Sequence, residues 1–447
     1  MKTTRTFTLP LLLASSAVLT ACGGGSDSSD TGGTGGNNTV ALSASVVQST
    51  VCNTTVPAST AELIVYDNNW AIKSRHKADA SGKINASIPK TDYVNISFVG
   101  TDGVGSARRI DIDTYAQHPV GDLGVYTIPG ASNQGCECQT TNITVTSTDR
   151  TLLRTPHLTG YNTNKPLDSY NSYDGSVNFY NVELCRSLNS SSWPTLYSAT
   201  NSSESFKAAG FLSGYDPASS LTLMLDQSPT TYSVNFDYAA NSTSVMHHFG
   251  DDYFSNSEPG SSSSAEIFDN IPNLSAISFR SYEGRTDYYN DIRVNIGRSQ
   301  RHSVAAPYTG TVDVTLPDQQ GPEELLQATF AWLNSESDSY DFGGISDFET
   351  FSITLAANLT DGSSYYQSFY GPKQGSLPSE PLPADYGVEP LLNEDDVVIY
   401  VGMFRYGEQQ TYQQYLTSKT AASKMPLSER ILGNRSQFNQ IFIDLYL

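Results

Sequence analysis

The sequence predicts an all-β protein, with tandem β-sandwich domains behind a flexible N-terminal tether. Short segments of alternating apolar and polar residues recur along the chain, and turns rich in Gly, Asp and Asn separate them. Tyr, which favours strands, is frequent, with 27 of 447 residues. Helix-favouring Ala, Leu, Lys and Glu dominate no long stretch. The length suggests two to four domains, each large enough for its own core.

Residues 1–21 have the layout of a secretory signal peptide. Lys2 and Arg5 precede an apolar run from about Leu9 to Leu19, and small residues follow that run. Polar residues interrupt the run, which falls short of the ~20 residues that a helix needs to cross a bilayer. We therefore predict that this segment directs export and that the remaining chain carries no membrane-spanning helix.

The stretch Leu19-Thr20-Ala21-Cys22 resembles the lipobox of bacterial lipoproteins. In that family the cysteine thiol receives a diacylglyceryl group, and the new amine is acylated after cleavage. The resemblance implies that Cys22 carries acyl chains such as palmitate, which anchor the protein in a membrane. Gly23 stands where lipoproteins of the inner membrane often carry Asp, which implies the outer membrane, on its periplasmic or surface face. An ordinary signal peptide with a chance cysteine is the alternative.

Residues 22–39 form the predicted tether. From Gly23 to Asn38 the segment consists mainly of Gly, Ser, Asp, Thr and Asn and has no large apolar side chain. Such a segment cannot bury enough surface to offset its ordering entropy. A random coil of this length reaches roughly 20–25 Å, which would lift the folded part clear of the membrane.

Residues 40–135 are predicted to form the first sandwich. Apolar residues alternate with polar ones in several short segments that end at turns, among them Ile84 to Ile88 and Val94 to Phe98. Six or seven such strands are typical of two packed sheets, each with one solvated face. We expect these residues to be largely buried: Leu63, Val65, Ile84, Ile88, Ile96 and Phe98.

Three stretches of this domain resemble the carboxypeptidase regulatory-like domain, a transthyretin-like sandwich. They are Leu63–Asp67, the turn and strand start Asp79–Ile84, and Tyr93–Phe98. In that family the module is accessory and non-catalytic. The resemblance therefore implies a fold and no catalytic residue.

Two further β-rich domains are predicted over residues 136–316 and 317–447. In the first, strands are expected at 220–226, 232–238, 276–282, 291–296 and 310–316, and residues 250–265 are expected to form a long loop. The stretch from Pro317 to Pro322 suggests the boundary. Beyond it, alternation predicts strands at 328–333, 351–355, 398–402 and 439–447, and Ser428 to Gly433 suggest a short helix.

Four cysteines remain after Cys22, and an even number in an exported chain indicates disulfides. Of the three possible pairings, one is disfavoured because Cys136 and Cys138 lie too close to join comfortably. We expect each of them to reach a distant partner, either Cys52 or Cys185. The bond to Cys52 would then close a loop around the whole first domain, and the bond to Cys185 would connect to the second domain. A metal site at Cys136-Glu137-Cys138 is the alternative, although its spacing differs from that of structural zinc sites.

The formal net charge of −21 argues against binding of nucleic acid or anionic lipid head groups. No sequence motif indicates a cofactor or a resident metal.

The densest group of possible metal ligands is His247-His248 with Asp251-Asp252. Adjacent histidines on a strand face opposite sides, so a solvated loop is the favoured interpretation of this group. Asp111 and Asp113 share a strand face, where paired carboxylates can act as acid and base. Because Arg108 and Arg109 stand next to them in the sequence, we favour the interpretation that Asp111 and Asp113 belong to an exposed charge pattern rather than to a catalytic pair.

Two aromatic runs are the remaining candidates for ligand binding. Tyrosines beside Asn and Asp can hold sugar rings or a peptide strand. The competing interpretation is that Tyr favours strands and packs its ring. The candidate residues are Tyr365, Tyr366, Phe369 and Tyr370, with Tyr282, Tyr288 and Tyr289 as a second group.

Together these features predict a lipid-anchored envelope protein that binds, adheres or serves as a scaffold, with a glycan or an envelope protein as its partner. The alternative is a hydrolase of polysaccharide or peptide, with carboxylates in a cleft between β domains. An open pocket with two carboxylates or a Ser/Cys–His pair would favour the enzyme. An exposed aromatic strip without such a pair would favour binding.

Overall fold

A computed structural model describes residues 38–446, apart from 104–107, 150–155, 161–162, 166–168, 172–175, 203–204, 250–251, 261, 290–291, 336, 379–385, 387–391 and 409–410. The signal segment, Cys22 and nearly all of the tether lie outside the described residues, so the predictions made for them remain predictions. Among the described residues, no helix is both long and apolar enough to cross a membrane.

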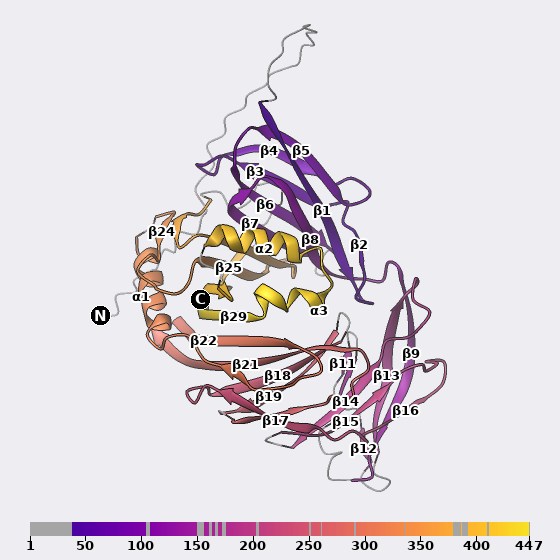
Figure 1. The fold of residues 1–447 in the computed structure, drawn as a ribbon. Helices are drawn as coiled ribbons and strands as arrows, with labels where there is room; N and C mark the ends of the chain where they lie inside the picture. The colour runs from indigo at the N-terminus through magenta and orange to yellow at the C-terminus, as the bar shows by residue number, and fades with distance from the viewer. Residues whose placement is uncertain are drawn as a thin grey trace, which may run out of the picture.

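Residues 39–132 form a β-sandwich, as predicted (Figure 1). One sheet has the order β2-β1-β5, with β8 paired to β1 in parallel, and it packs against β4-β3-β6-β7. All six predicted core residues, Leu63 to Phe98, are at most 5% exposed, which confirms the predicted strand alternation. The strands are β1 (Thr39–Thr50), β2 (Thr55–Pro57), β3 (Glu62–Tyr66), β4 (Ile72–Lys77), β5 (Lys83–Pro89), β6 (Tyr93–Asp102), β7 (Arg109–Pro119) and β8 (Gly121–Ser132).

The next segment is a second lobe made of strands, drawn below the first sandwich in Figure 1. All five strands expected here are present, but the predicted loop 250–265 is wrong, because it contains β19 and β20. Its many polar residues reflect an edge strand rather than an irregular loop. The strands are β9 (Cys136–Thr146), β10 (Pro156–Gly160), β11 (Thr163–Lys165), β12 (Ser169–Asn171), β13 (Ser176–Ser187), β14 (Leu196–Ser202), β15 (Ser205–Leu212), β16 (Leu221–Met224), β17 (Thr230–Phe236), β18 (Ser242–Phe249), β19 (Asp252–Pro259), β20 (Ser264–Ile267), β21 (Leu274–Tyr289), β22 (Ile292–Ala305) and β23 (Val312–Val314).

The last segment combines strands with helices, and here one predicted strand is wrong. Residues 328–333 lie in α1, whose start carries Pro322 in its first turn followed by Glu323 and Glu324, all favourable at a helix N-terminus. A second helix, α2, was not predicted, although Thr411 and Gln414 form a capping box at its start. The elements are α1 (Gly321–Leu333), β24 (Ser339–Asp341), β25 (Thr350–Leu359), β26 (Ser364–Gly371), β27 (Gln374–Ser376), β28 (Leu392–Tyr406), α2 (Tyr412–Ala422), α3 (Leu427–Arg430), the 3-10 helix η5 (Gly433–Arg435) and β29 (Gln437–Tyr446).

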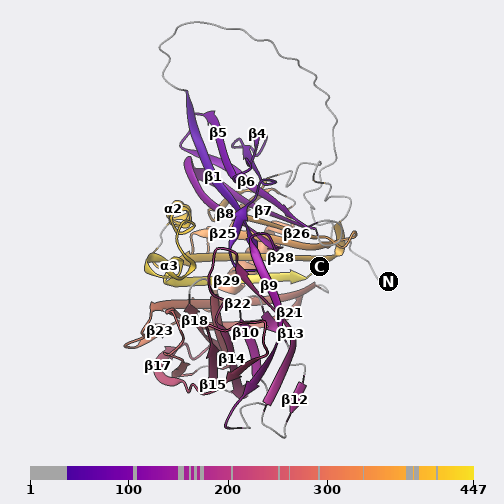
Figure 2. The same ribbon diagram turned by 90° about the vertical axis from the view of Figure 1, so that its right-hand side faces the viewer.

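One twelve-stranded sheet joins all three segments, in the order β19-β18-β21-β22-β29-β28-β25-β26-β7-β6-β3-β4. Its central strands stack between the first sandwich and the second lobe, and α2 and α3 lie to one side of them (Figures 1 and 2). The predicted boundaries at residues 136 and 317 therefore divide the sequence but not this sheet.

The two faces of the sheet differ. Ile399, Ile443 and Leu445 of the central strands point into a large core that α1 closes. On the opposite face, the first sandwich and α2 cover β6, β7 and one end of the central strands through a second core. The remaining part of that face, which none of the described elements covers, carries polar and aromatic side chains.

Candidate binding surface

A row of polar side chains crosses the uncovered face of the central sheet. The strands pair so that each member lies opposite the next, and register partners in a sheet share a face. Six strand spacings of ~4.8 Å give the row a length of about 29 Å. We call it the polar row; its members, from β21 to β7, are Thr286, Asn295, Asp444, Tyr400, Thr354, Ser368 and Asp113.

Side-chain hydrogen bonds organise the polar row. Thr286 Oγ1 donates to Asn295 Oδ1 at 2.9 Å, and Thr354 and Ser368 share a hydrogen bond of 2.9 Å. Tyr400 is 41% exposed, and the other members are exposed or half-buried. Solvent therefore reaches the row from Thr286 to Ser368, while its geometry is fixed by neighbouring strands.

Asp444 is the carboxylate at the centre of this surface. Asn295 on β22 and Tyr400 on β28 are its register partners on either side. Partial burial raises the pKa of Asp444 to about 6, against a smaller lowering by a hydrogen bond from Asn295. A charged Asp444 would accept strong hydrogen bonds, and near pH 6 it would change its protonation state.

Aromatic rings flank the polar row on both sides. Phe442 lies across Gly297, where an added Cβ would come within 2.6 Å of the ring, and it stacks on Tyr282 with 5.9 Å between centroids and 25° between planes. On the other side of the row, the guanidinium of Arg293 lies 4.5 Å from the ring centroid of Tyr446. Rings that are half-buried in this way offer flat apolar surfaces beside hydrogen-bonding groups.

The β7 end of the row meets a buried charged group on α2. The hydroxyl of Tyr115 donates to Asp113 Oδ2 at 3.1 Å and accepts a short hydrogen bond from Lys419 Nζ. Burial raises the pKa of Asp113 and lowers that of Lys419, although each group partly stabilises the charge of the other. This end therefore holds a desolvated charge pair bridged by one tyrosine.

A small cavity lies beside Lys419. Its volume of about 20 Å³ admits one or two water molecules and no larger ligand. We therefore assign this end of the row a structural role, in which α2 is fastened to the sheet. The lining residues are Phe98, Tyr115, His118, Leu123, Val125, Tyr126, Lys419, Thr420 and Ser423.

The predicted aromatic strip on β26 does not form. Because side chains alternate along a strand, Tyr365 and Phe369 point into the large core and are at most 4% exposed. Tyr370 stacks on Tyr115 beneath α2 at 5.1 Å, and Tyr366 lies under the guanidinium of Arg109. Of the four, only Tyr366 borders the uncovered face.

The second predicted aromatic group is divided in the same way. Tyr282 faces the candidate surface, where it stacks on Phe442, whereas Tyr289 packs against Phe330 at the large core. Tyr288 is 72% exposed near the end of β21. Tyr288 is in register with Arg293 on the same face as Tyr282, so Tyr282 and Tyr288 both contribute to the surface.

The histidines of the candidate metal cluster lie buried on strand β18, so the favoured interpretation as a solvated loop is wrong for them. As adjacent strand residues they point to opposite faces. His247 Nε2 accepts from the backbone N–H of Phe268 at 3.1 Å, and His248 Nε2 bonds to Ser278 Oγ at 2.9 Å. Asp251 lies outside the described residues, and the side chain of Asp252 is not described. The two imidazoles do not converge on one ion.

The Ser278–His248 pair resembles a nucleophile and its base only in composition. Ser278 is fully buried and shares a second hydrogen bond of 2.7 Å with Ser303. Burial lowers the pKa of His248 to about 4. A nucleophile must reach its substrate, so this buried pair is a core hydrogen-bond network.

Carboxylates in the described structure do not form an open catalytic pair on this face. Both oxygens of Asp111 accept from Arg109, at 2.7 and 2.8 Å. Asp111 is only 6% exposed, so the predicted exposed charge pattern is wrong for this residue, which forms a buried ion pair. Asp444 and Asp113 lie four strands apart, about 19 Å at ~4.8 Å per strand. Glycosidase pairs stand roughly 5–9.5 Å apart.

One disulfide joins the first sandwich to the second lobe, and the other links β9 to β13 within the second lobe. Cys52 bonds to Cys136, and Cys138 bonds to Cys185, so each member of the close pair has a distant partner. The carboxylate of Glu183 lies near the sulfurs of Cys138 and Cys185, but a disulfide leaves no thiolate for a metal. The predicted disulfide framework is confirmed, and the metal alternative does not fit.

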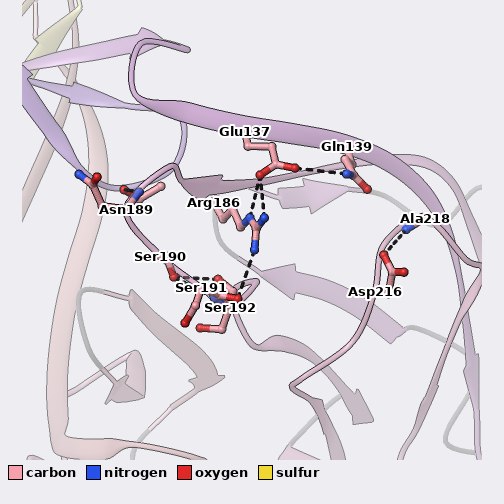
Figure 3. Close-up of polar contacts among 10 residues, drawn as sticks. Glu137, Gln139, Arg186, Asn189, Ser190, Ser191, Ser192, Asp216 and Ala218 are labelled. Atoms are coloured by element: carbon pink, nitrogen blue, oxygen red, sulfur yellow. Dashed lines mark hydrogen bonds and ion pairs between the residues drawn. The ribbon is translucent and has the colours of Figure 1, made fainter.

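An ion pair reinforces this border (Figure 3). Arg186 Nε and Nη2 both donate to Glu137 Oε2, at 3.0 and 2.8 Å, and Nη1 donates to the carbonyl of Ser191 at 3.3 Å. The same guanidinium lies 4.7 Å from the ring centroid of Trp193. Glu137 therefore holds the loop after β13 through Arg186.

Sequence reasoning missed most of the polar row. Asn295, Thr354, Tyr400 and Asp444 belong to four strands that are distant in the chain, and only the pairing register brings them together. A signal was present in the last strand, where Asp444 alternates with the core residues that the pattern did identify. Its polar partners could not be found without the strand order.

No protein-family model and no curated protein sequence matches this chain. Three solved structures show a weak likeness, each at 9% sequence identity. The shaft pilin SpaA of Lactobacillus rhamnosus GG has a TM-score of 0.14 over 42% of this chain and 98% of the pilin. A streptococcal ancillary pilin has a TM-score of 0.13 over 62% of this chain and 100% of the pilin. Two B repeat units of the collagen-binding protein of Staphylococcus aureus have a TM-score of 0.14 over 82% of this chain and 93% of the two repeats. TM-scores this low carry no argument about function.

Proposed function

We propose that the chain is a lipid-anchored envelope protein of the adhesion or scaffold type, which binds its ligand on the polar row. The observation that carries this proposal is the row from Thr286 to Ser368, a continuous set of solvent-accessible polar side chains with aromatic flanks. The lipobox-like stretch ending at Cys22 supports anchoring, and the predicted tether of residues 22–39 supports display away from the membrane.

The rigidity of the surface also supports binding. The row crosses seven adjacent strands of one sheet, so its members are positioned by backbone pairing rather than by loops. The large core holds the same strands from behind. A site that is already ordered loses less conformational entropy when it binds its ligand.

The described residues favour binding over hydrolysis. Asp444 and Asp113 are too far apart for a glycosidase pair, and the Ser278–His248 pair is buried. A hydrolase therefore has no specific observation in its favour on this face.

Retention on isolated envelope material tests the proposal. The full chain, purified in detergent, is passed over immobilised polysaccharide and protein fractions of the envelope. Thr354→Trp places a large side chain in the middle of the row on a strand position that tolerates it, and should abolish retention. Tyr93→Ala, an exposed tyrosine on β6, is the matched control and should be retained. Equal retention of Thr354→Trp, with an unchanged melting temperature, would refute the proposal.

A further inference from the structure

We infer that the ligand of the polar row is a neutral oligosaccharide that lies across the strands, with Asp444 and Asn295 bonding its hydroxyls and Phe442 beneath one sugar ring. This inference rests on the proposed function and names the chemical class of its ligand. It follows from three properties of the row, which are its hydrogen-bonding groups, its charge and its length.

The hydrogen-bonding groups match sugar hydroxyls. Thr354, Ser368 and Tyr400 carry hydroxyls that both donate and accept, and Asp444 accepts. The amide nitrogen of Asn295 already donates to Tyr446 Oη at 3.1 Å and also bonds to Asp444, so Asn295 offers its Oδ1 as an acceptor. A sugar hydroxyl also donates and accepts, so a chain of hydroxyls can pair with each member in turn. A peptide strand fits less well, because the backbone groups of β28 and β29 already pair with neighbouring strands and an added strand needs a free sheet edge.

The charges beside the row favour a neutral ligand. The carboxylate of Asp444 and the net charge of −21 disfavour a polyanion. Arg293 lies beside the row on β22, and the Asp111 carboxylate on β7 is already occupied by Arg109, so a polycation finds little uncompensated negative charge. The face therefore offers polar contacts of both signs without a strong field.

The aromatic platform supplies the apolar part of the site. Phe442 is two residues from Asp444 on β29, and Tyr282 stacks on it with 25° between the ring planes. A pyranose ring has an apolar face of C–H groups and a rim of hydroxyls. With its apolar face on Phe442, such a ring would direct its rim toward Asp444 and Asn295, which matches the arrangement of a pocket for polar ligands.

The row is long enough for several sugar units. From Asn295 to Ser368 it spans four strand spacings, about 19 Å at ~4.8 Å each. A single sugar would use only one part of this length. We therefore expect affinity to rise with the number of linked sugars until the row is filled.

Calorimetric titration of the full chain in detergent tests the inference. The probes are cello-, laminari-, malto- and manno-oligosaccharides of two to six units. At least one series should bind, with affinity that increases with length. Phe442→Ala and Asp444→Ala should each weaken binding at least tenfold, and Tyr93→Ala should leave it unchanged.

The pH dependence supplies a second measurement. The groups that face Asp444 are Tyr282 from β21, Asn295 and Arg293 from β22, and Tyr400 from β28. Because a charged carboxylate accepts stronger hydrogen bonds, wild-type affinity should fall as pH decreases through about 6. Asp444→Asn should remove this step and should still melt at or above the wild-type temperature.

Two outcomes overturn the inference. One is the absence of binding by every series, and the other is binding that Phe442→Ala and Asp444→Ala leave unchanged in folded protein. If the chain instead retains an envelope protein fraction and Thr354→Trp abolishes that retention, the proposed function stands and the oligosaccharide inference alone fails.

Discussion

Arg186 on β13 donates two hydrogen bonds to one carboxylate oxygen of Glu137. Glu137 lies between Cys136 and Cys138, each of which forms a disulfide with a distant cysteine. On β9, Cys136 bonds to Cys52 of the first sandwich, and Cys138, two residues further, bonds to Cys185 of the second lobe. This arrangement ties both lobes to one short piece of backbone. The shared twelve-stranded sheet ties them a second time.

Loss of the Cys52–Cys136 bond should destabilise the protein. The bond joins residues 84 apart, for which the chain-entropy model gives about 4–5 kcal/mol. The double variant Cys52→Ala/Cys136→Ala should lower the free energy of unfolding by an amount of that order, measured by urea denaturation. Peptide mapping without reductant should find both native pairs in the wild type. Free thiols at these positions in protein taken from the envelope would contradict the account.

Phe98→Ala should destabilise the first sandwich by about 3–5 kcal/mol. Phe98 is 4% exposed and stacks on Tyr126 with 4.8 Å between centroids, so its removal leaves a cavity between the two sheets. Chemical denaturation measures the change. Tyr93→Ala on the same strand should cost less than about 0.5 kcal/mol, and a similar cost for both would argue against the packing described.

Lys419→Met should loosen α2. The ammonium donates to Tyr115, which in turn donates to Asp113, so its loss leaves a buried acceptor without its partner. The expected cost is about 1–3 kcal/mol in the free energy of unfolding. Adding Asp113→Asn to the Lys419→Met variant should restore part of the lost free energy of unfolding, because the unpaired carboxylate is then absent. Strictly additive costs in this double-variant cycle would contradict the coupling of the two groups.

Stability should depend on the ionisation of Asp444. Its folded pKa of about 6 lies above the ordinary carboxyl value, so the folded state binds the proton more tightly than the unfolded chain does. The contribution of Asp444 to stability should therefore decrease as pH rises from about 4 to about 6, and stay level above that. Asp444→Asn should be more stable than wild type at pH 8, and the difference should vanish below pH 4. Thermal melts across this range provide the measurement, and the opposite slope would refute the burial of this carboxyl.

Cys22→Ser should release the protein from membranes into the soluble fraction, or leave it with an uncleaved signal. The reason is that a serine hydroxyl cannot replace the thiol that the lipobox resemblance assigns to acylation. Cell fractionation and the intact mass report both results. Unchanged membrane partition with an unchanged mass would remove the anchor from the account.

Local patterns predicted much of the fold. The alternation of Ile84, Ile88, Ile96 and Phe98 predicted buried strands, because strand period and burial are local properties. The same rule failed at residues 328–333, where three alternating apolar residues are too few to distinguish a strand from a helix. The disulfide framework could be predicted because Cys136 and Cys138 are too close to join.

The candidate surface depended on information that local patterns do not contain. Asp444 and Tyr400 are neighbours only because β29 pairs with β28 in one register, and a shift by one residue would turn each to the core. The aromatic run on β26 misled for the same reason. Its four rings divide between two faces, and the two that point into the large core, Tyr365 and Phe369, are buried.

Residue-specific photo-crosslinking on intact envelopes tests the central claim most directly. A photoreactive benzoylphenylalanine replaces Tyr400 in the polar row or, in a matched chain, Tyr93 on β6; the two tyrosines are 41% and 48% exposed. If the row is the binding surface, position 400 should give a discrete crosslinked product in envelopes and position 93 should give none. Equal products from both positions, or a product from position 93 alone, would contradict the account.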